Sequence, residues 1–433
     1  MKEKIKKVIP EFALNAYHKV RGFHAAFKHS FPAHKMIVIG VTGTKGKTST
    51  ANYIWSVLSA GGYHAGLITS ANFRIGEKEE PNTYHMTMPS ASFIQKKLSE
   101  MLAENVGIVV VEMTSEGMKQ YRHLGIPVDI AVFTNLTPEH LGSHKNDFEV
   151  YKKAKGPMFA ALQKAKRSFH GKVLPKVIIA NADSEHSEYY LSFPADQKIT
   201  FGLEQGMVQA LGLAQENNGT TFTAGGVRYA LSIPGTFNVY NALPAIVIGN
   251  LLDIPSLEIA RGLESLKVIP GRMESIDEGQ NFSVYVDYAH EPASLTALLT
   301  TARNLIEKEN KVILLMGVIG GGRAPRGTMA EIGAKMSDYL IITNEDPYDS
   351  NPVKMIADLG SVAIEAGKVE QEDLFLVLDR REAITKALTL AMKGDIVLIS
   401  GKGAESTMMT KEGAIPWNER EIVRDLVKSL TSL

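Results

Sequence analysis

The chain has 433 residues, which is too long for a single hydrophobic core and predicts two or three domains. Lys and Arg total 47 and Asp and Glu also total 47, so the overall charge does not indicate a nucleic-acid partner. Cysteine is absent, which excludes disulfides, thiol catalysis and cysteine-ligated metals. No apolar run has the length of a membrane span and no secretory signal is present, so we expect a cytoplasmic enzyme without an obligate protein partner.

Residues 1–34 form a basic segment that differs from the rest of the chain. The first 35 residues hold eight Lys or Arg against Glu3 and Glu11, and apolar residues recur roughly at helical spacing: Phe12, Leu14, Tyr17, Val20, Phe23 and Phe27. A basic amphipathic helix can lie on an anionic membrane surface, and such a helix more often packs on its own domain. Both interpretations stay open, with peripheral membrane contact as a possible role of residues 1–34.

A phosphate-binding loop is the strongest local signal. Residues 36–41 have the apolar character of a buried strand, a Gly-Thr-Lys-Gly turn follows at 43–46, and a helix is predicted at 49–60. In such loops backbone N–H groups and the helix N-terminus bind phosphate, the lysine (here Lys47) reaches the terminal phosphates and the hydroxyl (Thr48) holds Mg²⁺. The strict pattern has glycine where this chain has Val41. We therefore expect nucleotide binding.

The segments after the loop predict an α/β domain with a mostly parallel sheet. Strands are expected at 107–113, 129–136 and 176–180, alternating with helices. Short β-type pieces between 197 and 233 predict a small antiparallel insertion, and a helix is expected at 239–252. The expected division is a segment at 1–34, a central domain at 35–268 and a C-terminal domain at 269–433.

The C-terminal part repeats the alternating pattern and predicts a Rossmann-like α/β domain. Expected strands lie at 282–286, 311–316, 339–343 and 395–400, with helices at 293–307 and 381–392. The glycine run at 317–322 lacks the G-x-G-x-x-G spacing, so it is weak evidence for a dinucleotide site.

Three polar residues follow predicted strands or lie near the loop: Glu112, His140 and Lys155. A carboxylate at a strand end opposite a phosphate loop is typical of a Mg²⁺ ligand, because this ion prefers hard oxygen ligands. Each residue also has a plain alternative: Glu112 as a solvated loop acid, His140 as a surface histidine, and Lys155 as a lysine on an exposed helix face.

These segments resemble the Mur ligase family. The motifs GVTGTKGKTST, VVVEMTSEGMKQYR, AVFTNLTPEHL, VYKKAK, GTFNVYNALPA, PGRMES, VDYAHEPASL and SGKGAES occur in the family's order, most like the branch that adds the third stem-peptide residue to UDP-N-acetylmuramoyl-dipeptide. The resemblance implies an ATP-dependent amide ligase of peptidoglycan precursor synthesis. A substrate carboxylate would form an acyl phosphate, and the amine of an amino acid would then displace phosphate.

The resemblance also implies roles for individual residues. Catalytic roles fall on Lys47, Glu112, His140 and Lys155. Nucleotide contacts fall on Gly43, Thr44, Lys45, Gly46, Lys47, Thr48, Ser49, Asn238, Asn241, Arg272, Asp287 and His290. Two Mg²⁺ ions are implied, with ligands Thr48, Glu112, His140 and a carbamylated Lys155. Contacts with a muramyl-peptide-like acceptor or the amino acid fall on Thr87, Ser90, Ser115, Arg122, Asp346, Tyr348, Gly401 and Glu405.

Several positions depart from the family pattern. Only about 35 residues precede the first predicted strand, so we expect UDP to be read poorly or another carrier to be used. Diaminopimelate-adding members have D-N-P-R where this chain has E-D-P-Y at 345–348, which removes a bidentate clamp for a distal carboxylate. A lysine-like or other amino acid therefore becomes as plausible. The family's GKGHE reads GKGAE at 401–405, Glu116 replaces an expected histidine, and the 317–326 segment is shortened.

Two alternatives remain. A folylpolyglutamate synthase-like or poly-amino-acid ligase would use the same ATP chemistry on another acceptor. A non-catalytic nucleotide-binding scaffold is the other, although it has little reason to keep both His140 and Lys155 near one phosphate.

Overall fold

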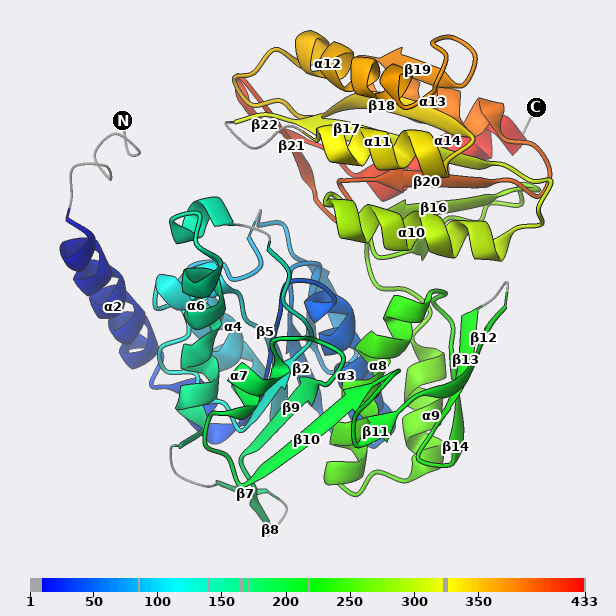
Figure 1. Ribbon diagram of the computed structural model, residues 1–433. Coiled ribbons are helices and arrows are strands. Elements are labelled where there is room, and N and C mark those ends of the chain that lie inside the picture. The colour runs from blue at the N-terminus through cyan, green and yellow to red at the C-terminus, as the bar shows by residue number, and fades with distance from the viewer. Residues whose placement is uncertain are drawn as a thin grey trace. The chain divides into compact units, whose positions relative to one another are not determined.

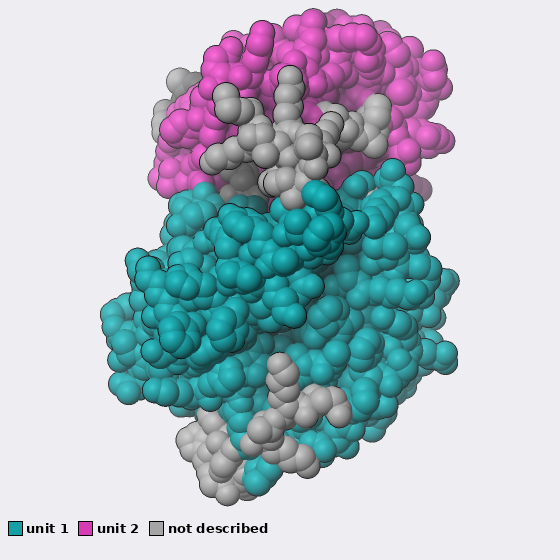
Figure 2. Space-filling view, turned by 90° about the vertical axis from the view of Figure 1, so that its left-hand side faces the viewer, with its two compact units in different colours: residues 1–213, 221–231, 237–266 teal, residues 214–220, 232–236, 267–433 magenta. Residues whose placement is uncertain are grey.

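The computed structural model describes residues 10–84, 86–138, 141–163, 167–169, 172–216, 219–321 and 326–431. His140 lies outside these residues, so its predicted roles stay predictions. The chain forms two compact units (Figure 2). Unit 1 comprises residues 1–213, 221–231 and 237–266, and unit 2 comprises residues 214–220, 232–236 and 267–433.

Unit 1 is built on a nine-stranded sheet in the order β11-β10-β9-β6-β1-β5-β2-β3-β4. Figure 1 labels its strands β2, β5, β9, β10 and β11. Its parallel strands are β1 (Ile37–Thr42), β2 (Ala65–Ile68), β5 (Ile108–Glu112), β6 (Ile130–Phe133), β9 (Val177–Asn181), β10 (Gln197–Gly202) and β11 (Val208–Gln209). The edge strands β3 (Asn72–Ile75) and β4 (Lys78–Pro81) are antiparallel. The central strands read as unbroken apolar runs because both faces of the sheet are covered.

The helices of unit 1 are mostly the crossovers that a parallel sheet requires. They are α2 (Glu11–Lys28), α3 (Lys47–Ala60), α4 (Ala91–Ala103), α5 (Ser115–Lys119), α6 (Phe148–Ala160), α7 (Ser187–Leu191), α8 (Thr236–Leu251) and α9 (Ser256–Ser265). Short 3₁₀ helices lie at η1 (Pro32–Lys35), η2 (Leu141–His144) and η3 (Ala161–Gln163), and β7 (Arg167–Phe169) pairs with β8 (Lys172–Leu174).

The predicted insertion at 197–233 is wrong in its first part. Strand β10 pairs in parallel with β9 and belongs to the main sheet, because Phe201 is fully buried there and anchors the strand. The separate small sheet contains only β12 (Leu211–Glu216), β13 (Gly219–Ala224) and β14 (Val227–Leu231). The short alternating pattern could not distinguish an edge strand of the main sheet from a strand of an insertion.

Unit 2 contains a six-stranded sheet in the order β15-β16-β20-β17-β18-β19. The strands are β15 (Glu274–Ser275), β16 (Ser283–Asp287), β17 (Val312–Ile319), β18 (Tyr339–Asp346), β19 (Leu374–Val377) and β20 (Ile396–Ser400), all parallel except β15. A hairpin of β21 (Thr407–Thr410) and β22 (Gly413–Pro416) follows.

Helices cover both faces of this second sheet (Figure 1). One face packs on α13 (Arg380–Leu390) and α14 (Glu419–Thr431) through a core that includes Ile313, Leu315 and Val423. The other carries α10 (Pro292–Leu305), α11 (Gly327–Met336) and α12 (Pro352–Glu365), where Gly333 lies against Leu314 and Leu340. Alternate strand residues thus face opposite layers.

The α/β class with two parallel sheets is confirmed in both units. Several predicted site residues lie at the carboxyl ends of parallel strands, the edge at which open α/β sheets bind ligands: the phosphate loop after β1, Glu112 of β5, Asp287 of β16 and Gly401 after β20. Within the described residues, no helix combines the length and the apolar character that crossing a bilayer requires. The predicted domain limits at 34/35 and 268/269 stay predictions.

Candidate active site

The phosphate loop of unit 1 connects β1 to α3 and has a conformation that requires glycine. Gly46 caps α3 with φ = 77°, a left-handed value that favours glycine. A Cβ on Gly46 would lie 2.1 Å from Asn241 Oδ1, so the neighbouring helix α8 also excludes a side chain. Because Gly46 caps the helix, α3 begins at Lys47, two residues before the predicted start. The N–H groups of its first turn therefore face the loop, as in anion-binding helix termini.

The loop is held in place by the residues that follow β6. Asn135 accepts hydrogen bonds from Thr44 N through its backbone oxygen (2.8 Å) and from Lys45 N through Oδ1 (2.9 Å). The Thr134 hydroxyl donates to the carbonyl of Lys45 (2.7 Å). Thr134 and Asn135 were missing from the predicted site, although their position directly after a predicted strand was a usable signal.

Thr48 and Glu112 lie together beside the loop. Thr48 Oγ1 donates to Glu112 Oε2 (2.9 Å), Ser70 N donates to the same oxygen (2.8 Å), and the Thr48 and Ser70 hydroxyls are 2.7 Å apart. The parallel register of β1 and β5 pairs Val41 with Glu112, which brings the carboxylate to the loop. Glu112 is only 2% exposed, so the alternative of a solvated loop acid is wrong. No group of three or more acidic, histidine or cysteine side chains suited to a metal occurs among the described residues.

Lys155 of helix α6 reaches the same loop from another side. Its Nζ donates to the carbonyl of Gly43 (2.9 Å) and lies 4.5 Å from the ring centroid of Tyr151. Lys155 is 2% exposed, so it does not lie on an exposed helix face. Tyr151 connects it to the loop, because the Tyr151 and Thr44 hydroxyls are 3.1 Å apart.

Two further charged or titratable groups complete this region. Lys47 Nζ donates to the carbonyl of Thr44 (2.7 Å). His144, which sequence reasoning missed, is buried with its ring centroid 5.0 Å from that of Tyr151. We call Gly43, Thr44, Lys45, Gly46, Lys47, Thr48, Glu112, Asn135 and Lys155 the phosphate-loop cluster.

Asn238 and Asn241 lie one helical turn apart on α8 and are both buried. Asn241 Nδ2 donates to Asn238 Oδ1 (3.1 Å), and Asn241 Oδ1 is 3.5 Å from the hydroxyl of Thr50 on α3. Asn241 therefore lies against the phosphate loop at Gly46. Ser49, another predicted nucleotide contact, is buried in the first turn of α3.

The residues predicted to contact the acceptor lie around one short loop. Arg122 donates to the carbonyl of Met88 and contacts Met86 Sδ (3.5 Å), so it contacts the loop on both sides of Thr87. Burial lowers the pKa of Arg122, and Glu116 partly opposes this shift. Ser115 is buried in the first turn of α5. Ser90 caps α4, because its hydroxyl oxygen accepts a hydrogen bond from Phe93 N (3.3 Å). Its hydroxyl therefore has a structural role in addition to the predicted acceptor contact.

In unit 2, Asp287 lies at the end of β16 and His290 follows it. Asp287 accepts hydrogen bonds from the backbone N of Met273 and of Ala289 (2.7 Å each), yet burial outweighs these bonds and the charge of Arg272 and raises its pKa. The Arg272 guanidinium lies over the Tyr288 ring, with its Cζ 4.4 Å from the ring centroid. Burial and the positive charge of Arg326 lower the pKa of His290 to about 4, so it is neutral at pH 7.

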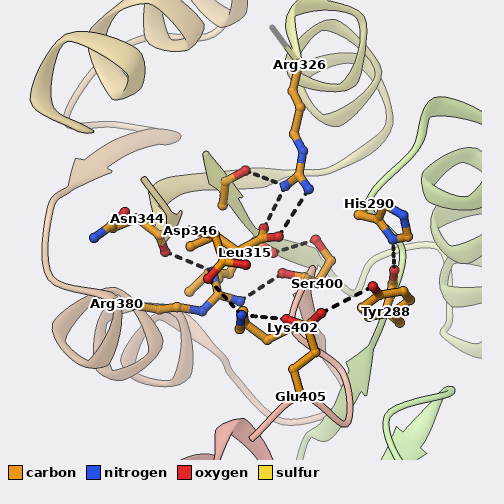
Figure 3. A network of polar contacts seen from close by, with 12 residues as sticks. Tyr288, His290, Leu315, Arg326, Asn344, Asp346, Arg380, Ser400, Lys402 and Glu405 are labelled. Atoms are coloured by element: carbon orange, nitrogen blue, oxygen red, sulfur yellow. Dashed lines mark hydrogen bonds and ion pairs between the residues drawn. The ribbon is translucent and has the colours of Figure 1, made fainter. Parts of the chain in front are cut away.

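A second polar group surrounds Lys402, which is fully buried after β20 (Figure 3). Its Nζ lies 2.5 Å from Glu405 Oε2 and 3.0 Å from Asp346 Oδ1. Burial opposes the charge on Lys402, but Glu405 and Asp346 outweigh it and raise its pKa. Tyr288 donates to Glu405 Oε1 (3.3 Å), which connects this group to the Asp287 region.

Two arginine–carboxylate pairs lie beside Lys402, and Figure 3 labels the arginine of each pair, Arg326 and Arg380. Arg326 makes a bidentate contact with Glu345 (2.6 and 3.1 Å). Arg380 pairs with Glu419 and also donates to the carbonyl of Ser400 (2.9 Å). Burial opposes the charge on Glu345, but Arg326 and the other cations lower its pKa. We call Arg326, Glu345, Asp346, Arg380, Lys402, Glu405 and Glu419 the buried charge network; sequence reasoning found only Asp346 and Glu405 as site residues.

The other two predicted residues lie at the margin of this network. Gly401 has φ = 114°, and a Cβ there would lie 2.3 Å from Glu345 Oε2, so the carboxylate of Glu345 fills the space beside it. Tyr348 is half-buried with φ = 53°, and its backbone N donates to the carbonyl of Met409 (3.2 Å).

Comparison with known proteins agrees with this geometry. Residues 41–249 match the Mur ligase middle domain, and residues 271–403 match the Mur ligase, glutamate ligase domain. The chain is 34% identical over 411 residues to UDP-N-acetylmuramoyl-L-alanyl-D-glutamate–2,6-diaminopimelate ligase of Geobacillus kaustophilus, covering 92% of this chain and 80% of that protein. It is 35% identical over 409 residues to ligase 1 of the same name from Clostridium acetobutylicum, covering 92% and 80%.

Solved structures show the same fold. A structure of UDP-N-acetylmuramoyl-L-alanyl-D-glutamate–2,6-diaminopimelate ligase aligns with a TM-score of 0.64 at 23% identity, covering 95% of this chain and 83% of that one. Folylpolyglutamate synthase of Mycobacterium tuberculosis aligns with a TM-score of 0.70 at 15% identity, covering 98% and 99%. At these identities the structural likeness concerns the fold alone, whereas the domain matches and the sequence relatives establish membership. The chain belongs to the Mur ligase family.

Proposed function

We propose that this chain is an ATP-dependent ligase that joins an amino acid to a muramyl-peptide-like acceptor. The observation that carries the proposal is the phosphate-loop cluster, in which the Thr48–Glu112 pair and the buried Lys155 converge on one glycine-rich loop. An acceptor carboxylate would attack the γ-phosphate of ATP to give an acyl phosphate and ADP. The amine of the amino acid would then attack the acyl carbon, form the amide bond and release phosphate.

The oxygen donors beside the loop fit Mg²⁺. A threonine hydroxyl and a carboxylate within 2.9 Å of each other are hard ligands of the kind that Mg²⁺ shares with nucleotide phosphates. When bound there, the ion would neutralise phosphate charge. We propose Thr48 and Glu112 as its protein ligands, and His140 with a carbamylated Lys155 for a second ion. Carbamylation would convert the buried Lys155 amine into an oxygen donor.

The remaining atoms of the cluster would position the phosphates. The N–H groups of Gly46 and of the first turn of α3 would bind them. The hydrogen bonds of Thr44 N and Lys45 N to Asn135, and of Thr134 to the carbonyl of Lys45, would hold the loop in place before ATP arrives. Lys47 would contribute a cation close to the terminal phosphates. Asn238 and Asn241, with Arg272, Asp287 and His290, stay proposed nucleotide contacts.

For the amino acid, we propose Glu405 as the group that holds the incoming amine. Lys402 and Tyr288 fix both of its oxygens, so the carboxylate is pre-oriented. Asp346 is bound by Lys402 and by Met409 N (2.7 Å), and Tyr348 stands two residues later in place of arginine. Among the described residues, Arg326 is paired with Glu345 and Arg380 with Glu419, so neither guanidinium is uncommitted for a distal carboxylate; Arg323 lies outside the described residues. We therefore propose that a lysine-like or other amino acid is preferred over diaminopimelate.

The decisive assay supplies purified full-length chain with ATP, Mg²⁺, UDP-muramyl-dipeptide and a pool of amino acids, and identifies the ligated product by mass spectrometry. We expect a muramyl tripeptide and ADP. Products with folate and glutamate would instead support the folylpolyglutamate-type alternative, which the shared fold does not exclude.

Two further outcomes separate the remaining alternatives. Nucleotide binding without any ligated product would favour the scaffold. Direct competition between meso-diaminopimelate and L-lysine tests the specificity, and a strong preference for diaminopimelate would contradict the interpretation of Tyr348.

A further inference from the structure

Helix α2 binds unit 1 through its smallest residues. Gly22, Ala25 and Ala26 are its buried residues. A Cβ on Gly22 would lie 2.4 Å from the carbonyl oxygen of Tyr121, and a Cβ on Gly125 would lie 2.4 Å from the Cβ of Ala26. This close backbone approach fixes which side of the helix faces the domain, because a larger side chain at Gly22 would not fit.

Another side of α2 is aromatic and exposed. Phe12 (76% exposed), Phe23 (59%) and Phe27 (65%) lie there with Val20, at a spacing that places all four on one helix face. We call these four residues the aromatic stripe. Three of them also line, with Lys19, His24 and Leu124, a hollow of about 470 Å³. In Figure 1 the helix stands at the edge of unit 1, with one long side turned away from the sheet. The large apolar side chains of α2 therefore lie outside, and its smallest residues face the domain.

Positive charges flank this stripe. Lys19, Arg21 and Lys28 are exposed on α2, and Arg21 donates to the Tyr17 hydroxyl (3.2 Å), which keeps its charge beside the aromatic face. The helix has one acid, Glu11, and Lys145 neutralises it at 3.0 Å. Four more lysines precede the helix in the sequence: Lys2, Lys4, Lys6 and Lys7. An aromatic face bordered by cations complements a surface that is apolar below and anionic above.

We propose that α2 docks the protein on an anionic lipid surface, with the aromatic stripe inserted among the acyl chains and the flanking cations at the headgroups. A second copy of this chain fits the same face less well. A symmetric dimer through α2 would bring the cations of both copies together, and like charges repel. This contact would keep unit 1 at the membrane without a spanning helix.

The test is vesicle flotation with the full-length protein. Vesicles of phosphatidylglycerol and phosphatidylcholine should bind the protein, vesicles of phosphatidylcholine alone should bind it at least about tenfold less, and raising the salt from about 0.1 M to about 0.5 M should weaken binding. The variant Phe12→Ser/Phe23→Ser/Phe27→Ser should reduce binding at least about tenfold. The variant Lys19→Glu/Arg21→Glu/Lys28→Glu should have a similar effect.

Matched controls separate the helix from general surface effects. Met207→Ser/Leu257→Ser removes exposed apolar side chains elsewhere in unit 1 (71% and 68% exposed), and Lys78→Glu/Lys153→Glu/Lys198→Glu makes the same charge change at other exposed positions. Both should bind vesicles like the parent protein, and nucleotide affinity should be equal in all variants.

Several results would overturn the proposal. They are no binding to anionic vesicles, equal binding to both vesicle types, or binding unchanged by the serine variant. Sedimentation equilibrium adds a further arm. A dimer that the serine variant abolishes, in a protein that does not bind vesicles, would assign the stripe to a second copy instead.

Discussion

The phosphate-loop cluster and the buried charge network use different means to hold polar groups at the end of a parallel sheet. In the first, backbone groups and uncharged side chains hold the loop, because Thr134 and Asn135 contact it through neutral hydrogen bonds. In the second, charged side chains neutralise one another, and Arg380 and Glu419 are both fully buried. These neutral bonds hold the backbone of the loop without adding charge to it. A buried network of charges is rigid and tolerates little change, because each charge depends on its partner.

The largest expected effect concerns the stability of unit 2. Arg380→Ala leaves Glu419 buried without its main partner and should lower the free energy of unfolding by about 3–5 kcal/mol. Lys354→Ala, which breaks the exposed pair with Asp358, should cost less than about 1 kcal/mol. Denaturant unfolding followed by the fluorescence of Trp417, in a Trp55→Phe background, measures both. Equal costs for the two variants would refute the claim that burial makes the charge network intolerant of change.

The second prediction concerns catalysis in the phosphate-loop cluster. Lys155→Ala should reduce kcat by at least about 10²-fold, because it removes the proposed carbamate ligand next to the loop. Added short carboxylates should restore part of the activity. Lys153→Ala, on the exposed side of the same helix, is the control and should retain full turnover. Unchanged activity of Lys155→Ala would rule out the second-metal role.

The third prediction separates backbone strain from steric exclusion. Gly46→Ala places a Cβ at φ = 77° and 2.1 Å from Asn241, so nucleotide affinity should fall at least about tenfold. Gly62→Ala has a similar φ of 81° but no atom within 4 Å, so it should cost about 1 kcal/mol of stability without affecting nucleotide affinity. Calorimetric titration with ATP and denaturant unfolding give the two readouts. Similar nucleotide affinities in both variants would show that Asn241 does not restrict the loop.

The fourth prediction concerns a pH dependence in unit 2. The folded-state pKa of His290 is about 4, below its ordinary value near 6.5, so the unfolded chain binds the proton first as pH falls. Its contribution to stability is therefore complete above about pH 6.5 and is lost as the pH falls toward 4, with a slope of at most about 1.4 kcal/mol per pH unit. His290→Asn should flatten the unfolding free energy between pH 4.5 and 6.5, relative to the parent. If the unfolding free energy has the same pH slope in both proteins, the lowered pKa of His290 is contradicted.

Local patterns were sufficient for the parts of the fold whose causes lie close together in the chain. The phosphate loop at 43–48 can be recognised in the sequence, because its glycines, its lysine and its hydroxyl residue directly follow a strand. The strand order of the sheet was harder to predict from the sequence. Strand β10 was assigned to an insertion, because local sequence patterns do not show its parallel pairing with β9. Thr134 and Asn135 were missed although they follow a predicted strand, because the sequence does not show that this strand end meets the loop. His144 was missed because only its packing on Tyr151 places it near the loop.

The amino-acid sequence by itself determined the α/β class, the phosphate loop and the Mur ligase family, because each depends on residue types at short, recognisable spacings. Only the tertiary structure decided which distant groups meet. Arg326 and Glu345, or Arg380 and Glu419, are paired by the packing of strands and helices and not by their spacing. The same holds for α2: its period predicted an amphipathic helix, but only the close approach at Gly22 decided that the aromatic side faces outward.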